Sequence, residues 1–267
     1  MDEIMVPRTL YVSILREPVQ QYESSFYYLG MHTFFGLKLS QNPLGEFMID
    51  PDKHMDKVRR GRGMALPENF GLFQNGMLFD LGYDTLELKR VGGVREAITT
   101  LEREIDLFLL VDYFDESLLL LKKAMCWSLD KILYFRQNQR TNRIPINEKT
   151  KARIRSWNSD DVALYQHFNS TFWRKVHDYG PSFKKDLREL RHYLREWEKR
   201  CDRREVVKGK DAGAVRFFKV GHKAKAEHRE MCARFFRTEL EYIAYFRETY
   251  LQQINDKYAQ YRQIKRS

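Results

Sequence analysis

The sequence predicts an α/β fold with an incomplete parallel sheet, followed by a mainly helical C-terminal half. Two apolar segments without polar alternation, residues 9–16 (TLYVSILR) and 107–112 (LFLLVD), predict strands that are buried on both faces. Helical sequence separates them, which is the order of elements in α/β proteins. After Cys126 the pattern is helical almost throughout. We therefore expect a partial α/β core over residues 1–180 and a helical C-terminal extension over residues 181–267.

The helices expected around these strands have recognisable ends. Pro18 suits the first turn of a helix that runs to about Gly30, whereas prolines and glycines over residues 36–83 predict short helices and long loops. Asp115 and Glu116 suit the first turn of a helix after the second strand. Further helices are expected over residues 94–104, 149–155, 160–179, 182–203 and 226–265, with a basic loop over residues 205–225.

The composition indicates a folded chain with an anionic partner. Of the 267 residues 43% are hydrophobic, and the 18 Phe, 15 Tyr and 4 Trp favour packed helices over a solvated tail. The formal charge of +10 points to a nucleotide, a sulfated product, nucleic acid or a membrane surface, although most basic residues stand among acidic ones and fit solvated helix faces. No nucleic-acid-reading motif is present, so we expect no nucleic-acid partner.

The sequence contains no pattern typical of a membrane span or a secretory signal. Its most apolar stretch, residues 105–127, is interrupted by charges such as Asp112 and Lys122 and lacks the ~20 apolar residues that a span needs. Residues 1–8 contain no basic region leading into an apolar run. Any membrane attachment is therefore expected through an anchor that is absent from this sequence.

The three cysteines are too few for a disulfide framework and lack metal-binding spacing, so no metal site is expected. Cys126 lies in an apolar helix and is expected in the core. Cys201 and Cys232 end one predicted helix and begin the next, so a disulfide between them closes the basic loop; two reduced cysteines are the alternative. Asn169 begins the sequon Asn-Ser-Thr and is expected to be glycosylated if the protein is lumenal.

The segment from Ile14 to Phe26 (ILREPVQQYESSF) carries the candidate ligand site. Arg16 lies at the carboxyl end of a predicted parallel strand, the edge at which α/β folds bind ligands, and a guanidinium can hold a phosphate with two parallel hydrogen bonds. Ser24 follows inside the helix that Pro18 begins, where its hydroxyl can turn toward the same anion. From the spacing alone, the simpler interpretation is that Arg16 pairs with Glu17 or Glu23 and that Ser24 is an ordinary helix residue.

The arrangement of Arg16, Pro18 and Ser24 resembles the 3′-phosphate-binding element of sulfotransferases that use 3′-phosphoadenosine 5′-phosphosulfate (PAPS). The run LREPVQQYESSFYY is similar, more narrowly, to the galactose-3-O-sulfotransferase family, which includes galactosylceramide sulfotransferase. The resemblance continues in the same order through NGMLFDLG, LVDYFDESLLLL, CWSLDKILYF, WNSDDVALYQHFNSTFW and CARFFRTELEY. It therefore covers most of the chain.

This resemblance implies a P-loop-like sulfotransferase core and a membrane protein of the Golgi apparatus whose catalytic part is lumenal. Such an enzyme transfers sulfate from PAPS to the 3-hydroxyl of a terminal galactose on a glycolipid or glycan. Carried over to this sequence, Arg16 and Ser24 hold the 3′-phosphate of the donor. The resemblance identifies neither the catalytic base nor the residues that bind the acceptor.

Several other residues are weaker candidates. Asp112, Asp115 and Glu116 lie where the second strand gives way to a helix and can meet a sugar hydroxyl, although capping of that helix explains Asp115 and Glu116 better. Aromatic side chains that can stack on galactose fit core packing at least as well; they are Trp157, Tyr165, Phe168 and Trp173. The histidines His32, His54, His167 and His177 are too isolated to nominate as a base.

The sequence departs from the family pattern at its beginning. The membrane anchor, the loop with lysine and Ser/Thr that binds the 5′-phosphosulfate, and a histidine-containing segment are not found here. We therefore interpret the chain as the C-terminal part of such an enzyme, inactive by itself. The alternative is a non-catalytic nucleotide-binding or regulatory protein derived from the same fold.

Overall fold

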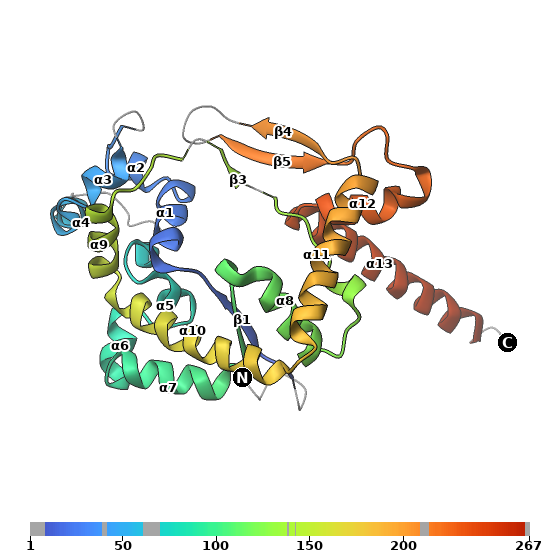
Figure 1. The fold of residues 1–267 in the computed structure, drawn as a ribbon, viewed down its shortest axis with the longest axis horizontal. Coiled ribbons are helices and arrows are strands. Elements are labelled where there is room, and N and C mark those ends of the chain that lie inside the picture. The colour runs from blue at the N-terminus through green and yellow to red at the C-terminus, as the bar shows by residue number, and fades with distance from the viewer. Residues whose placement is uncertain are drawn as a thin grey trace. The chain divides into compact units, whose positions relative to one another are not determined.

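The structure is a computed structural model. It describes residues 9–38, 42–60, 70–137, 139–141, 143–208 and 214–264. The described residues form two compact units (Figure 1). The first comprises the chain up to Ile132 and the stretch Arg140–Arg191, and the second comprises Leu133–Gln139, residues 192–208, and the chain from Ala214 onward.

The first unit contains a two-stranded parallel sheet. Strand β1 (Val12–Leu15) pairs with β2 (Leu107–Leu110), with Val12 opposite Leu107 and Leu15 opposite Leu110. All four residues of β2 are buried, as its apolar sequence predicts, whereas Val12 and Ile14 of β1 are exposed. The expected α/β class with a parallel sheet and mostly helical content is confirmed in this form.

Helices surround the sheet in the first unit (Figure 1). The predictions for α1 (Pro18–Tyr28) and α7 (Val94–Glu104) are confirmed, and α8 (Phe114–Ala124) follows β2 as expected. The remaining helices of this unit are α2 (Met31–Phe34), α3 (Pro43–Phe47), α4 (Pro51–Arg60), η2 (Phe70–Phe73), α5 (Gly76–Asp80), α6 (Thr85–Val91), η3 (Val111–Tyr113), η4 (Leu129–Ile132), α9 (Glu148–Trp157), α10 (Ser159–Tyr179) and the first part of α11 (Phe183–Arg200).

Helix α10 organises the core of the first unit because it contacts β2, α5, α7 and α8. Leu164, Phe168 and Phe172 lie on one side of α10 and are buried against the sheet. The preceding turn of α10 holds α5 in place, since the two oxygens of the buried Asp161 accept the backbone N–H groups of Met77 (3.0 Å) and Leu78 (2.9 Å). A second aromatic cluster packs α1 against its neighbours through Phe26, Phe35, Phe47, Phe73 and Ile154.

The expectation that Cys126 is a core residue is wrong, because its side chain is exposed. Helix α8 buries Leu118, Leu119 and Leu120 and ends at Ala124. Cys126 follows in a turn with a φ of 53°, so it no longer shares the buried face of the helix.

The second unit contains a β-hairpin where the sequence predicts a basic loop. Strands β4 (Arg204–Lys208) and β5 (Val215–Lys219) are antiparallel, and the short β3 (Gln139–Arg140) completes a sheet of order β3-β5-β4. The charged residues that suggest a loop lie at the ends of both strands, while Val206 and Phe217 pair at their centre. β-branched and aromatic residues of this kind favour strands.

The single helix expected over residues 226–265 is also wrong, because the structure divides it into η6 (Ala226–His228), α12 (Arg229–Phe236) and α13 (Glu239–Ile264). The break occurs at Thr238. Its hydroxyl accepts the N–H of Glu241 (3.3 Å), and the Glu241 carboxylate accepts the N–H of Thr238 (2.6 Å). This reciprocal pair is a capping box, which starts a new helix.

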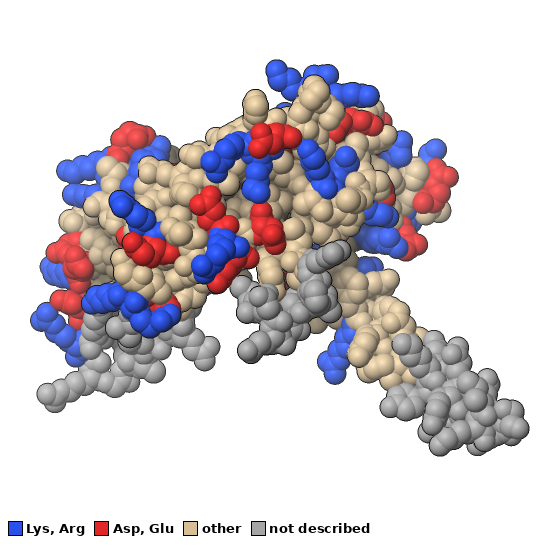
Figure 2. Space-filling model, turned by 90° about the horizontal axis from the view of Figure 1, so that it is seen from below, with Lys and Arg blue, Asp and Glu red and all other residues tan. Residues whose placement is uncertain are grey.

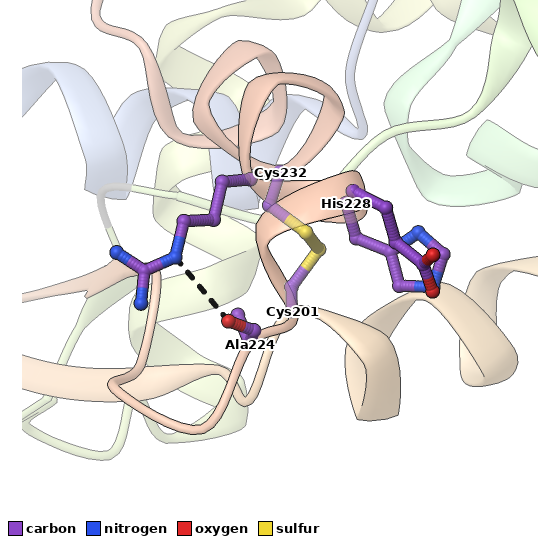
Figure 3. The surroundings of a disulfide bond; sticks show 6 residues. Cys201, Ala224, His228 and Cys232 are labelled. Atoms are coloured by element: carbon purple, nitrogen blue, oxygen red, sulfur yellow. Dashed lines mark hydrogen bonds and ion pairs between the residues drawn. A yellow bond between two sulfur atoms is a disulfide. The ribbon is translucent and has the colours of Figure 1, made fainter.

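A disulfide joins the end of α11 to α12. The sequence predicts the pairing of Cys201 with Cys232, and the structure forms this bond with the two Cα atoms 5.4 Å apart. Both cysteines are fully buried beside Phe135 and against Trp197. Figure 3 shows the bond next to His228 and the turn at Ala224. The bridge thus ties the hairpin region to the helices on either side of it.

Basic and acidic side chains are intermingled on the face that Figure 2 shows, which fits the interpretation of most charges as solvated helix surface. Among the described residues, no helix combines the length and the apolar character required to cross a bilayer.

Candidate anion-binding site

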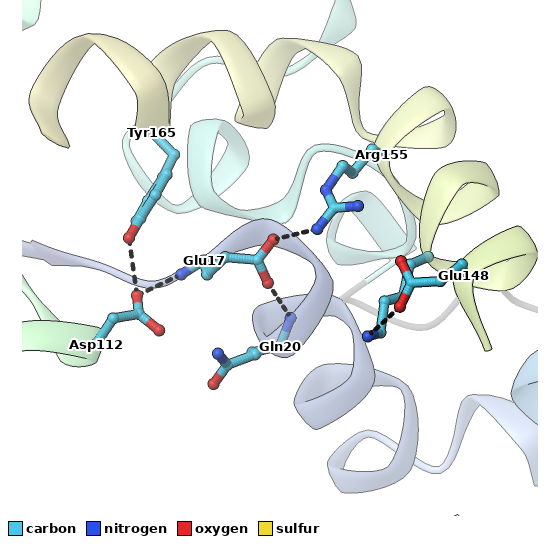
Figure 4. A network of polar contacts seen from close by, with 7 residues as sticks. Glu17, Gln20, Asp112, Glu148, Arg155 and Tyr165 are labelled. Carbon is cyan, nitrogen blue, oxygen red and sulfur yellow. Dashed lines mark hydrogen bonds and ion pairs between the residues drawn. The ribbon is translucent and has the colours of Figure 1, made fainter. Parts of the chain in front are cut away.

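The carboxyl ends of β1 and β2 bring chemically active residues to one edge of the sheet. Because Leu15 lies opposite Leu110, the residues that follow each strand leave the sheet at the same edge. The backbone N–H of Glu17 donates to Oδ2 of Asp112 over 2.8 Å, so the two strand ends are joined directly (Figure 4). The sequence places Arg16 and Asp112 at strand ends, and the structure brings these ends together.

The Asp112 carboxylate receives a second bond from α10. The Tyr165 hydroxyl donates to Oδ2 of Asp112 over 3.1 Å, and burial together with the charge of Asp112 raises the pKa of Tyr165. Tyr165 therefore remains a neutral donor at physiological pH. Of the aromatic residues that the sequence analysis considers for sugar stacking, Tyr165 points toward this edge of the sheet (Figure 4).

Glu17 fixes the start of α1. Its Oε2 accepts the N–H of Gln20 over 3.0 Å, which caps the helix that Pro18 begins, and its Oε1 lies 3.3 Å from Nη2 of Arg155 on α9 (Figure 4). Both carboxylate oxygens of Glu17 are therefore occupied.

Glu23 of α1 is buried and holds two further arginines at this edge. The Arg140 guanidinium bonds to its Oε1, and Nη1 of Arg143 lies 3.9 Å from its Oε2. Arg140 also lies over the Tyr27 ring, with 4.0 Å between the guanidinium carbon and the ring centroid. Arg140 is thus mostly buried and held by Glu23 and the Tyr27 ring, whereas the Arg143 side chain is about half exposed.

No carboxylate of the described residues forms an ion pair with Arg16. The carboxylates that the sequence offered as partners are engaged elsewhere, Glu17 by Arg155 and Glu23 by Arg140 and Arg143. Among the described residues Arg16 forms no ion pair, and its enclosed Nε has no hydrogen-bond partner. Burial, followed by the nearby charge of Arg143, lowers the pKa of Arg16 despite the opposing effect of Asp112 and Glu23.

A half-buried cation beside a second cation is destabilised, and an external anion relieves this repulsion. Arg16, Arg140 and Arg143 carry three positive charges against the two negative charges of Glu23 and Asp112. The edge is therefore a candidate site for a compact anion, and a phosphate matches the geometry of a guanidinium.

Ser24 is not brought to Arg16 by any contact in the described chain. Tyr22, Glu23 and Phe26 form the buried side of α1, and Ser24 is exposed with no hydrogen bond to the described residues. Its role toward a phosphate stays a prediction.

Most of the weaker sequence candidates have structural roles. Asp115 and Glu116 pair with Arg191 at 2.7 and 3.0 Å. Trp157 donates through Nε1 to the carbonyl of Phe73 over 2.8 Å. Phe168 is buried against Phe108, with 3.8 Å between ring centroids, whereas Trp173 is exposed and meets the Tyr113 ring edge-on. His167 lies 3.1 Å from Glu102, away from the strand ends.

Sequence reasoning missed Arg140 and Arg143. They lie in a stretch without helical or strand periodicity, and the partner that positions them, Glu23, is 117 residues from Arg140. The pattern of two arginines three residues apart just before a helix N-cap at Asn147 gives no indication of such a distant partner.

The fold and the site together are those of an α/β protein with a candidate anion-binding site at the carboxyl edge of its parallel strands. A family profile described as galactose-3-O-sulfotransferase matches residues 1–249. The chain belongs to the galactose-3-O-sulfotransferase family.

Similar proteins carry related names. Galactosylceramide sulfotransferase of Bos taurus is 40% identical over 180 residues, which cover 66% of this chain and 41% of that protein. The protein of the same name in Mus musculus is 32% identical over 256 residues, covering 89% of this chain and 59% of the relative. Galactose-3-O-sulfotransferase 3 of Mus musculus is 34% identical over 208 residues, covering 75% and 46%. The chain thus spans about half the length of these relatives, and no solved structure matches it.

Proposed function

We propose that this chain is the donor-binding part of a PAPS-dependent sulfotransferase, and that the whole protein transfers sulfate to the 3-hydroxyl of a terminal galactose on a glycolipid or glycan. Family membership supports this proposal, as do relatives named for sulfate transfer to galactose or galactosylceramide. The two-stranded parallel sheet of the described residues is compatible with part of a P-loop-like sulfotransferase core.

The observation that carries the proposal is the guanidinium of Arg16 at the strand end, which forms no ion pair with any described residue. A dianionic 3′-phosphate matches it in charge, and the fork of a guanidinium binds two phosphate oxygens at once. Arg143 is half exposed and close enough to Arg16 to lower its pKa, so it can share the same phosphate. Arg140 is already held by Glu23 and Tyr27, so we assign it no direct contact with the phosphate.

The residues of this chain bind and orient the donor at its 3′ end. When bound, PAPS supplies a sulfuryl group whose bond to the 5′-phosphate breaks as a bond to galactose O3 forms. Positioning contributes strongly to such group transfers, because the reacting atoms must be aligned. A base must accept the hydroxyl proton. We assign that base and the 5′-phosphosulfate loop to the segment that this chain does not contain.

We also propose that the whole protein lies in the Golgi membrane with this part in the lumen. The buried disulfide between Cys201 and Cys232 supports an oxidising compartment. Membrane attachment then comes from an anchor outside the present chain.

Calorimetry with two nucleotides tests donor binding by the 267-residue chain. Adenosine 3′,5′-bisphosphate and adenosine 5′-monophosphate differ only in the 3′-phosphate. We expect the bisphosphate to bind more tightly, and Arg16→Ala to weaken its binding at least about tenfold, because each charge-assisted hydrogen bond contributes about 1.5 to 3 kcal/mol. Binding of the monophosphate should change little.

Arg174→Ala is the matched control. Arg174 is an exposed arginine that lines a cavity near the amino end of β2, away from the strand edge that holds Arg16. Its substitution should leave both affinities unchanged. Equal affinity of wild type and Arg16→Ala for the bisphosphate would show that the 3′-phosphate does not bind at this edge.

A further inference from the structure

The second unit carries most of the positive charge of the chain. Residues 192–237 contain 14 Lys and Arg against 7 Asp and Glu, whereas the whole chain has a formal charge of +10. The hairpin of β4 and β5 lies within this stretch, with its two strands side by side (Figure 1). An anionic partner of the second unit is therefore expected to meet the hairpin region.

The two faces of the hairpin differ in charge. Side chains alternate along a strand and cross-strand partners share a face, so the register divides the described hairpin residues into two sets. One face, which we call the basic face, consists of Arg204, Val206, Lys208, Val215, Phe217 and Lys219. The other face consists of Glu205, Val207, Arg216 and Phe218. Arg216 is paired there, since its Nε lies 2.9 Å from Oε1 of Glu205, whereas the described basic face contains no acid.

Two like charges oppose each other across the basic face, because Arg204 lies directly opposite Lys219. Both side chains are exposed, and neither forms an ion pair with a described residue. Arg204 instead donates through Nη1 to Nε2 of His222 over 2.7 Å. Like charges directly opposite each other destabilise a pair of strands, and an anion between them removes this repulsion.

The nearby acid Glu241 does not supply that anion. It lies close enough to Lys219 to interact with its charge, but its carboxylate accepts the N–H of Thr238 over 2.6 Å in the capping box of α13. The space between Arg204 and Lys219 therefore fits an external anionic group.

A third cation and an apolar centre extend the basic face along the hairpin. Lys208 lies four residues from Arg204 on the same strand, which separates their Cα atoms by about 13 Å. Val206 and Phe217 pair between them, and Nζ of Lys208 lies 5.4 Å from the centre of the Phe217 ring. A single compact anion cannot meet cations at both ends of this face. A ligand that meets all three cations carries several anionic groups along an extended body.

We propose that the basic face binds a sulfated saccharide chain. One sulfate group lies between Arg204 and Lys219, another meets Lys208, and a sugar ring packs against Phe217. Sulfate esters on successive sugars supply anionic groups at intervals along an extended body. The choice of sulfate among anionic groups rests on the proposed function, since sulfate transfer to galactose yields such a saccharide. The basic face then contacts the glycan in the second unit, whereas Arg16 belongs to the first.

The apolar residues of the hairpin argue against a lipid surface as the partner. Elements that lie on anionic membranes insert exposed apolar side chains beside their basic residues. Among the described hairpin residues the exposed large apolar side chain is that of Val207, at 50%, and it lies on the other face. The apolar side chains of the basic face are only partly exposed. A saccharide therefore fits this face better.

Calorimetry of the 267-residue chain with a sulfated galactan hexasaccharide tests the proposal, and the same hexasaccharide after desulfation is the reference ligand. We expect the sulfated form to bind at least about tenfold more tightly. Lys219→Gln should raise its Kd at least about fivefold, and Lys219→Gln with Arg204→Gln at least about tenfold, because charge-assisted contacts are lost. Arg216→Gln is the matched control, since it removes the same single charge from the other face; it should raise the Kd less than about twofold.

Melting temperatures separate loss of the ligand site from loss of the fold. Removing one of two opposed like charges stabilises the free hairpin. Lys219→Gln should therefore raise the melting temperature of the second unit by about 1 to 3 °C while it weakens saccharide binding. A side chain needed only for folding shows the opposite change in melting temperature.

Two variants distinguish this proposal from the proposed function. Arg16→Ala should bind the sulfated hexasaccharide as the wild type does. Lys219→Gln with Arg204→Gln should bind adenosine 3′,5′-bisphosphate as the wild type does. Either site can therefore fail without the other.

Four results would overturn the proposal. The first is equal affinity for the sulfated and desulfated hexasaccharides, and the second is an equal loss from Arg216→Gln and Lys219→Gln, which would indicate attraction to net charge alone. The third is a lower melting temperature of Lys219→Gln. The fourth is tighter binding to phosphatidylserine vesicles or to single-stranded DNA than to the sulfated hexasaccharide, which would assign the face to lipid or to nucleic acid.

Discussion

Substituting glutamine for Glu23 should destabilise the first unit more than any surface ion-pair change. Glu23 neutralises Arg140 and Arg143, and the side chains of Glu23 and Arg140 are only 10% and 14% exposed. Glutamine keeps the shape of the side chain but removes its charge. Three arginines then meet at the strand edge with Asp112 as the remaining nearby acid.

The expected loss follows from the burial of this pair. Breaking a buried ion pair by neutralising one partner costs about 3 to 5 kcal/mol, because the other charge is left unpaired in a poorly hydrated site. Since Arg143 is half exposed and water screens it, we expect the lower end of that range, about 3 kcal/mol. Adenosine 3′,5′-bisphosphate should restore part of the stability, because its phosphate supplies the missing negative charge.

Urea unfolding and thermal melts measure this effect. The matched control is Glu148→Gln, since Glu148 pairs with Lys151 at 2.7 Å but its side chain is 83% exposed. Such a surface pair contributes about 0 to 1 kcal/mol. If Glu23→Gln were no more destabilising than Glu148→Gln, the arginine cluster around Glu23 would not be the strained site that the account requires.

Three further predictions concern other parts of the chain. Replacing Cys201 and Cys232 by serine should lower the unfolding free energy of the second unit by about 3 to 4 kcal/mol through loss of loop closure, and a melting temperature insensitive to this change would exclude a stabilising bridge. Burial raises the pKa of Asp161 to about 6. Between about pH 4 and pH 6 the folded state therefore binds more protons than the unfolded state. The contribution of Asp161 to the free energy of unfolding falls as the pH rises through this range. Between about pH 4.5 and 7 the wild type should lose about 2 kcal/mol relative to Asp161→Asn in urea titrations, and identical pH profiles would contradict this. Asn169 should carry a glycan in protein from a secretory pathway, so glycosidase should shift its gel mobility and Asn169→Gln should abolish the shift; an unshifted wild type would leave Asn169 as a helix residue.

Elements with strong local patterns were predictable from the sequence. Pro18 and the apolar spacing after it indicate α1, and unbroken apolar runs indicate β1 and β2. Local patterns gave wrong predictions at two places in the second unit. The hairpin of β4 and β5 has charged strand ends that resemble a loop, and the break at Thr238 depends on a capping box inside an otherwise continuous helical pattern.

The candidate site was predictable only in part, because strand ends are local and ion pairs are not. The position of Arg16 at the end of a parallel strand is a local property, and the sequence indicates it. Whether Arg16 pairs with Glu17 or Glu23 depends on the other ion pairs of these carboxylates. Glu17 pairs with Arg155, and Glu23 pairs with Arg140 and Arg143, all of which come from distant segments. No spacing rule connects residues so far apart.

Sulfate transfer by an extended chain is the most direct test of the central claim that the Arg16 edge holds the sulfate donor. The 267-residue chain is joined to the upstream segment of a family relative and assayed with radiolabelled PAPS and a β-galactoside. We expect product sulfated at galactose O3 from the extended chain and none from the 267-residue chain. In the extended chain, Arg16→Ala should lower kcat/KM at least about tenfold, whereas Arg174→Ala should not. Full activity of the extended chain with Arg16→Ala, or clear turnover by the 267-residue chain alone, would contradict the account.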